Sequence, residues 1–179
     1  MLLPPPTQRI VFRKWTDRDI DDFSAMNLDP EVMQFYPSLL SREQTEVSMG
    51  AIKNQFEKMG YGLYVVEHRS TNQFMGYIGF STPSFESFFT PCTEIGWRLK
   101  RNYWGQGLAS EGGAACLAFG FSNLGLQKVF SFTAAVNFRS ERVMNKIGMT
   151  KTGEFEHPKL PSDHWLRRHV LYCAGAPEN

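Results

Sequence analysis

A glycine-rich stretch, residues 102–113 (NYWGQGLASEGG), has the composition and spacing to bind an anion. It lies between an alternating segment and an apolar one, where a strand would lead into a helix. A helix N-terminus exposes unpaired N–H groups, and glycines such as Gly105 and Gly107 let a ligand approach that backbone. A tight strand-to-helix turn would use the same glycines. Neither GxxxxGK[ST] nor GxGxxG is present, so the stretch alone leaves both interpretations open.

The composition narrows the class of protein. The chain has 179 residues, a net charge of +1, 42% hydrophobic and 21% charged residues, which is ordinary for a globular protein and offers no large basic surface for nucleic acid. No apolar run approaches 18 residues, and the N-terminal sequence lacks the features of a signal peptide. We therefore expect a single domain over residues 1–179, in the cytoplasm, with no membrane or nucleic-acid partner.

The cysteines and histidines form no metal-binding pattern. Cys92, Cys116 and Cys173 lie far apart, and neither CxxC nor HxxxH spacing occurs. An odd number of cysteines also argues against a disulfide framework. We expect reduced thiols and no metal ion.

Alternating strands and helices would position the glycine stretch. Strands are expected at residues 9–15, 61–68, 74–80, 93–99, 128–135, 149–157 and 167–174, and helices at 16–26, 29–36, 41–60, 108–125 and 137–148. Asp29 before Pro30, and Ser41 with Gln44, have the spacing of helix caps. The strand–helix–strand units of the second half indicate a mixed sheet, after an antiparallel first half.

Two local patterns refine this arrangement. Along residues 94–99 the side chains alternate between two faces of a strand. Ile95, Trp97 and Leu99 form an apolar face, and Glu94 points to the opposite face. Gly112 and Gly113 fall inside the helix at 108–125, where each glycine costs about 1 kcal/mol relative to alanine. A helix that accepts this cost is expected to pack closely against its sheet.

Two motifs in this order resemble those of the GNAT acyl-CoA N-acyltransferase superfamily. They are YWGQGLASEG after EIGWRL, and VNFRSERVMNKIGM further on. The branch resembled contains the ribosomal-protein N-terminal acetyltransferases, and the resemblance covers essentially the whole chain. The family's pyrophosphate loop reads [RQ]xxGx[GA], from which Asn102 departs at the first position. The resemblance implies an α/β fold with a mixed, largely antiparallel sheet of about seven strands flanked by helices, and acetyl-CoA as co-substrate.

The resemblance also implies the residues that bind the cofactor. The main chain of the strand carrying Trp97 and Leu99 would bind the pantetheine arm, and Asn137 would contact the cofactor near the thioester. Backbone amides of one loop would hold the pyrophosphate: Trp104, Gly105, Gln106, Gly107, Leu108 and Ala109.

Acetyl transfer from a thioester to an amine needs a group that accepts the amine proton. Glu94 is the first candidate, because it begins the strand that would carry the cofactor and points away from the apolar face. A carboxylate in a partly buried cleft has a raised pKa and can relay a proton. Glu67 is the second candidate. The alternative for Glu94 is a solvated charge on a strand.

The departing thiolate needs a proton donor or another source of stabilisation. Many family members have a tyrosine seven residues after the asparagine, but Met144 at that position cannot donate a proton. Ser140 shares a helix face with Asn137, and the branch resembled commonly has serine there, so Ser140 is the candidate acid. The alternative is a serine bonded to its own helix. Tyr103 is a further candidate for the proton donor, and the alternative is that its ring packs as an aromatic residue of the loop.

Further residues would surround the cofactor or the acceptor. Arg139, Arg142 and Lys146 share a helix face, which is either a solvated basic surface or a contact for the ribose phosphate of coenzyme A. The candidates for the acceptor wall, which alternatively belong to the core or the surface, are Phe35, Tyr36, Phe85, Phe88, Phe89, Asp163 and His164.

The leading hypothesis is an N-acetyltransferase that moves the acetyl group of acetyl-CoA to a primary amine by direct attack in a ternary complex. The acceptor is a protein N-terminus or a small amine. A hypothesis of a different class is a non-catalytic acyl-CoA sensor or interaction module on the same fold. An ATP-binding protein would need a Walker lysine and Mg²⁺ ligands, which the sequence lacks. The sequence does not distinguish a monomer from a homodimer.

Overall fold

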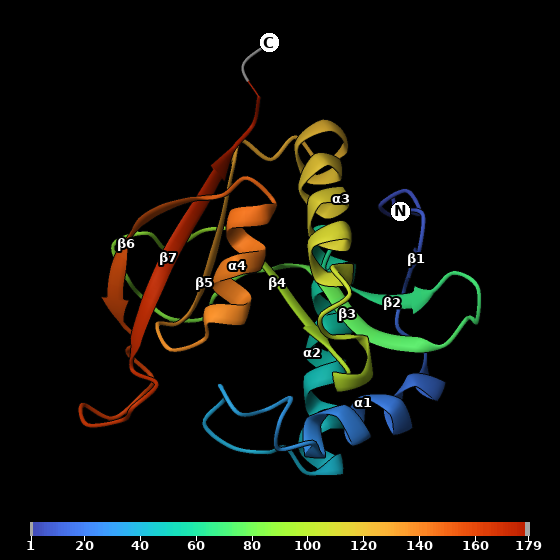
Figure 1. Cartoon of the computed structure of the whole chain (residues 1–179), viewed down its shortest axis with the longest axis horizontal. Helices are drawn as coiled ribbons and strands as arrows, with labels where there is room; N and C mark the ends of the chain where they lie inside the picture. The colour runs from blue at the N-terminus through green and yellow to red at the C-terminus, as the bar shows by residue number, and fades with distance from the viewer. Residues whose placement is uncertain (1, 178–179) are drawn as a thin grey trace.

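The computed structural model describes residues 2–177, which form one seven-stranded sheet with helices on both faces (Figure 1). The strands are β1 (Ile10–Arg13), β2 (Leu63–His68), β3 (Phe74–Ser81), β4 (Glu94–Leu99), β5 (Lys128–Ala134), β6 (Thr150–Glu156) and β7 (Arg168–Gly175). The helices are α1 (Ile20–Leu28), α2 (Arg42–Met59), α3 (Leu108–Asn123) and α4 (Phe138–Lys146), with short 3₁₀ turns at Asp17–Asp19 and Arg101–Tyr103.

The sheet is mixed and largely antiparallel, which confirms the predicted fold class. Its strand order is β1-β2-β3-β4-β5-β7-β6, and all neighbours are antiparallel except β4 and β5. These two parallel strands share a single paired position, Glu94 with Phe130. Beyond that position they diverge, so the sheet is open at its centre.

Helix α3 lies close against the sheet, as its internal glycines predicted. In Figure 1 α3 and α4 cover the near face of the sheet, and α2 lies behind it. A Cβ atom added at Gly112 would stand 2.4 Å from Cδ1 of Ile78 on β3, and one added at Gly113 would stand 3.3 Å from Cδ1 of Ile147. The missing side chains therefore let α3 approach β3 and the end of α4.

The predicted cap of α2 is present. The Ser41 hydroxyl accepts from the backbone N–H of Gln44, whose side chain accepts from the backbone N–H of Ser41 (2.8 Å). Gly60 ends the helix in the left-handed conformation (φ +78°). These reciprocal bonds satisfy donors that a helix start would otherwise leave unpaired.

The helix expected at residues 29–36 does not form, and that prediction is wrong. Asp29 Oδ1 accepts from the backbone N–H of Glu31 (2.9 Å) as a cap would, yet only isolated turns follow. Pro37 explains the failure, because it pushes Tyr36 away from helical geometry and leaves too few residues to propagate a helix. The first helix also starts later than expected: the capping box at Thr16 opens a 3₁₀ turn, and α1 begins at Ile20.

All three cysteines are free. Among residues 2–177, no helix combines the length and apolar character needed to cross a bilayer.

Candidate functional site

A cleft of about 990 Å³ occupies the opening between β4 and β5. The first-choice catalytic residues, Glu94 and Ser140, line it, as do all the predicted cofactor-binding residues except Gln106. Gln106 instead braces the glycine loop: its carbonyl oxygen accepts from Nη1 of Arg9 (2.9 Å), and its side-chain amide donates to the carbonyl of Asn102 (2.8 Å). The cleft therefore brings together two motifs that lie about 30 residues apart in the chain.

The glycine loop presents bare backbone to the cleft. Gly105 and Gly107 both adopt left-handed conformations (φ +73° and +79°), which side chains disfavour. Space beyond Gly105 is open, since an added Cβ would meet no heavy atom within 4 Å. Gly107 is the N-cap of α3 and provides no side-chain cap. The first N–H groups of α3 are thus left for a ligand, and the helix dipole favours a negative one.

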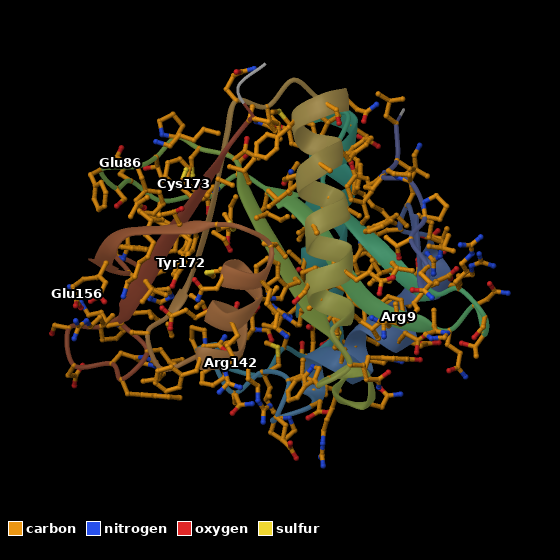
Figure 2. All side chains as sticks on the ribbon, turned by 45° about the horizontal axis from the view of Figure 1, so that its top comes forward. Arg9, Glu86, Arg142, Glu156, Tyr172 and Cys173 are labelled. Atoms are coloured by element: carbon orange, nitrogen blue, oxygen red, sulfur yellow. The ribbon has the colours of Figure 1, made fainter. Side chains whose placement is uncertain are left out.

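An N-terminal segment holds this loop from outside, which sequence reasoning missed. The Glu111 carboxylate, in the first turn of α3, accepts from the Thr7 hydroxyl (2.6 Å) and from the backbone and guanidinium of Arg9 (2.9 and 2.7 Å). Figure 2 shows Arg9 beside the N-terminal end of α3. These contacts lower the pKa of Glu111 against the opposing effect of burial. No sequence pattern links residues about 100 positions apart.

The β4 edge that faces the opening has no paired strand beyond Glu94. The carbonyl of Thr93 accepts from the N–H of Phe130 (2.9 Å), and Lys100 N–H donates to Met75 on the other side (2.8 Å). Because backbone groups alternate along a strand, those of Trp97 and Leu99 point toward β5, as the prediction for a pantetheine contact requires. One of them is engaged: the Leu99 carbonyl accepts from the indole N–H of Trp104 (2.8 Å).

Asn137 and Ser140 lie together at the start of α4. Asn137 Oδ1 accepts from the backbone N–H of Ser140 (3.2 Å), which caps the helix, and Asn137 Nδ2 donates to the Thr133 hydroxyl (2.9 Å). The asparagine is thereby fixed with one amide hydrogen unused. The Ser140 hydroxyl forms no hydrogen bond to its own helix among the described residues. Met144, the position where a tyrosine would stand, is fully buried.

Glu94 lies where β4 and β5 part. Its carboxylate accepts from the Ser81 hydroxyl (3.0 Å) on the neighbouring strand. Burial raises the pKa of the Glu94 carboxyl group to about 7, and the Ser81 hydrogen bond opposes this only in part. A carboxyl group with this pKa exchanges protons readily near neutral pH.

The wall formed by α4 is basic. The Arg139 guanidinium lies over the Trp104 ring (4.9 Å to the centroid), and Arg142 and Lys146 also line the cleft. Figure 2 labels Arg142 on α4. Arg139 thus lies beside the glycine loop, and its positive charge favours an anion at the same place as the N-terminus of α3.

The other candidates are divided between the cleft and the rest of the molecule. Glu67 forms an ion pair with Arg13 (2.6 Å), away from the cleft lining. Tyr103 lines the cleft, with its hydroxyl donating to Gln73 (3.1 Å). Of the proposed acceptor wall, Phe35 and Tyr36 line the cleft, and Phe88 is 75% exposed. Asp163 and His164 do not line it; nor do Phe85 and Phe89, which belong to an aromatic cluster with Phe130, Phe132 and Phe155.

Several residues that line the cleft were not singled out from sequence, and four of them carry large polar or titratable side chains. These four are Tyr77, Arg98, His157 and His169. The two histidine rings lie 4.9 Å apart, and burial lowers the pKa of His157 to about 4 and also lowers that of His169, so both are neutral at pH 7. Arg98 shares the face of β4 that carries Glu94, so the alternation already contained a signal for it. His157 directly follows β6, and His169 lies at the start of β7. No sequence pattern indicates that these two residues meet.

No group of three or more His, Cys, Asp or Glu side chains within residues 2–177 has the arrangement of a metal site.

Comparison with known proteins places the chain among acetyltransferases. The family model described as an acetyltransferase (GNAT) domain matches residues 9–150. The Bacillus subtilis protein YkkB is 35% identical over 146 residues, which cover 80% of this chain and 83% of YkkB.

Solved structures share the fold over nearly the full length. A GNAT-family acetyltransferase from Bacillus anthracis superposes with a TM-score of 0.78 at 26% identity, covering 96% of this chain and 97% of that one. A RimL ribosomal L7/L12 alpha-N-protein acetyltransferase in complex with coenzyme A has the same TM-score at 16% identity, covering 96% and 97%. At that identity the likeness to RimL concerns the fold alone.

Proposed function

Because the chain belongs to the GNAT acetyltransferase family, we propose that it transfers the acetyl group of acetyl-CoA to a primary amine. One observation carries this proposal: a single cleft joins an uncapped, glycine-lined helix N-terminus to an enclosed carboxyl group with a pKa near neutrality. An anionic carrier and a proton acceptor are what acetyl transfer to an amine requires.

The residues of the cleft fit acetyl-CoA, which supplies an activated acyl group when bound. The amides of residues 104–109 would hold the pyrophosphate, next to the basic side chains of Arg139 and Arg142. The free backbone of Trp97 would hydrogen-bond the pantetheine arm. The solved RimL complex, whose fold is the same, supports coenzyme A as the carrier.

Glu94 and Ser140 would manage the two protons of the reaction. The amine nitrogen forms a C–N bond with the acetyl carbonyl carbon while the C–S bond breaks. The proton lost by the amine passes to Glu94, directly or through water, and Ser140 donates its hydroxyl proton to the departing sulfur. Water carries the proton from Glu94 back to Ser140, so both groups end the cycle as they began it. The products are an N-acetyl amide and a free thiol, with no change in oxidation state. This order requires both substrates in the cleft together, without an acetylated enzyme.

An acetylation screen with the full chain tests the proposal. Acetyl-CoA is mixed with a panel of small amines and N-terminal peptides, and free thiol is followed with a colorimetric reagent. We expect amine-dependent thiol release and a matching mass increase of the acceptor. If coenzyme A binds but no amine in the panel is acetylated, the chain is an acyl-CoA-binding sensor, and the catalytic proposal fails.

A further inference from the structure

We propose that the acceptor carries a carboxylate in addition to its amine, and that Arg98 binds this carboxylate. The inference rests on the proposed function, since it assigns the acceptor end of the same cleft. It concerns the face of β4 opposite Trp97 and Leu99.

Arg98 is a half-buried cation whose enclosed Nε has unused hydrogen-bonding capacity. Its Nη1 donates to the side-chain oxygen of Asn27 (2.6 Å). Its Nε is enclosed and has no hydrogen-bond partner, and no carboxylate in the described part of the chain forms an ion pair with it. The guanidinium lies over the rings of Tyr36 (3.9 Å to the centroid) and Tyr77 (5.3 Å). These contacts fix the orientation of its plane.

A charge withdrawn from water without a counter-ion is costly, and a bound ligand is one source of the missing partner. The rings and hydroxyl groups of Tyr36 and Tyr77 offset part of this cost, but both side chains are neutral and leave the guanidinium without an anionic partner. A planar carboxylate matches a flat guanidinium and accepts two hydrogen bonds from it. A polyamine would instead place a second positive charge beside Arg98.

Gly96 leaves room for such a molecule between Arg98 and Glu94. The three residues alternate on β4, so Glu94 and Arg98 point to the same face with Gly96 between them. A Cβ added at Gly96 would meet no heavy atom within 4 Å, so the space above it is open. Four strand residues place the two backbones about 13 Å apart, and both side chains line the same cleft. An acceptor can then present its amine to Glu94 and its carboxylate to Arg98.

Matched acceptors test the inference on the unaltered protein. Amino acids, including ω-amino acids of increasing length, are compared with their carboxamides and with amines that lack the carboxylate. A second arm compares peptides whose second residue is Asp or Asn, which separates a free amino acid from a peptide. We expect kcat/KM to be at least about tenfold higher for the carboxylate member of the preferred pair, as one charge-assisted contact provides. Equal rates for carboxylate and carboxamide overturn the inference.

Substitution of Arg98 gives a second measurement. We expect Arg98→Gln to raise KM for the carboxylate acceptor about tenfold or more and to leave the carboxamide nearly unchanged, with Arg98→Lys intermediate. Arg18→Ala, which removes an exposed arginine outside the cleft, is the charge control and should keep the preference. Thermal unfolding verifies that each variant folds. If Arg98→Gln is unstable, the acceptor pairs on the unaltered protein still decide the question.

The outcomes separate the two proposals. Acetylation of amines without any carboxylate preference overturns the role of Arg98 and leaves the acetyltransferase proposal standing. Absence of acetylation with every amine overturns both.

Discussion

At Glu94, burial and one hydrogen bond act in opposite directions on the same carboxyl group. Burial raises its pKa to about 7, and the Ser81 hydroxyl stabilises the charged form without restoring the ordinary value. The group is therefore protonated in roughly half of the molecules at neutral pH. A general base works only when it is deprotonated, so its state ties activity to pH.

We expect kcat/KM to rise as pH increases through about 7 and then to level off, after correction for ionisation of the amine itself. The reason is that Glu94 becomes an acceptor only above its raised pKa. Glu94→Gln should lower kcat by about 10²-fold or more and abolish this inflection. A pH–rate profile of both proteins is the measurement, and an unchanged profile in Glu94→Gln would assign the inflection to another group.

The same pKa shift predicts an effect on stability. A carboxyl group whose pKa is raised in the folded state binds its proton more tightly there than in the unfolded chain. The free energy of unfolding therefore falls as pH rises from the ordinary value near 4.5 to about 7. Glu94→Gln removes this loss, so the variant should gain up to about 3 kcal/mol over the wild type above pH 7 and almost nothing at pH 4. Urea titrations at both pH values test the difference.

Ser140 can be tested separately from the cap that surrounds it. The cap uses the backbone N–H of Ser140 and the side chain of Asn137, so Ser140→Ala should change the free energy of unfolding by less than about 0.5 kcal/mol. We expect kcat to fall by at least about tenfold if the hydroxyl protonates the thiolate. Ser122→Ala, whose hydroxyl donates to the Ala118 carbonyl of its own helix, is the matched control. Full activity in Ser140→Ala would remove this residue from the mechanism.

At the scale of elements, α3 depends on the absence of side chains at its contact with β3. Gly112→Ala would place a methyl group 2.4 Å from Ile78, so the helix or the strand must shift. We expect a loss of about 1–3 kcal/mol in the free energy of unfolding and weaker coenzyme A binding, because α3 also carries the glycine loop. Gly50→Ala in α2 is the control: an added Cβ there meets nothing within 4 Å.

In that control the helix propensity of alanine should stabilise the protein by about 0.5–1 kcal/mol. Chemical denaturation of both variants gives the comparison. Equal effects of the two substitutions would contradict close packing of α3.

Sequence patterns predicted the elements better than the contacts between them. The cap at Ser41 and the glycines of α3 are local features, and both are confirmed. The helix at 29–36 failed because Pro37 outweighed a correct cap at Asp29. The Arg9–Glu111 bonds and the lack of an ion pair at Arg98 depend on which distant segments meet, and no spacing rule contains that information. The roles of the site residues stay predictions.

At the scale of the whole molecule, the sheet consists of two parts joined at Glu94 and Phe130. Strands β1–β4 form one part and β5–β7 the other, with the cleft between them. The inner edge of β4 has no strand partner beyond the junction. A ligand can therefore form hydrogen bonds with the backbone of this inner edge, just as an added strand could at an outer edge of a sheet.

Amide hydrogen exchange can show whether this inner edge binds coenzyme A. The N–H of Trp97 points into the opening, whereas that of Arg98 points to β3. We expect the Trp97 amide to exchange quickly in the free protein and at least about tenfold more slowly with coenzyme A, and the Arg98 amide to be slow in both. Protection of Trp97 before coenzyme A is added would mean that the edge is already paired.

The opening also gives the sheet four edges where seven strands in one layer would ordinarily have two. Exposed edges are templates for pairing with other chains, and the inner ones run along apolar segments of β4 and β5. When heat loosens the two parts, these edges become the first sites where copies can join. Coenzyme A bound between β4 and β5 would therefore reduce aggregation in addition to taking part in the reaction.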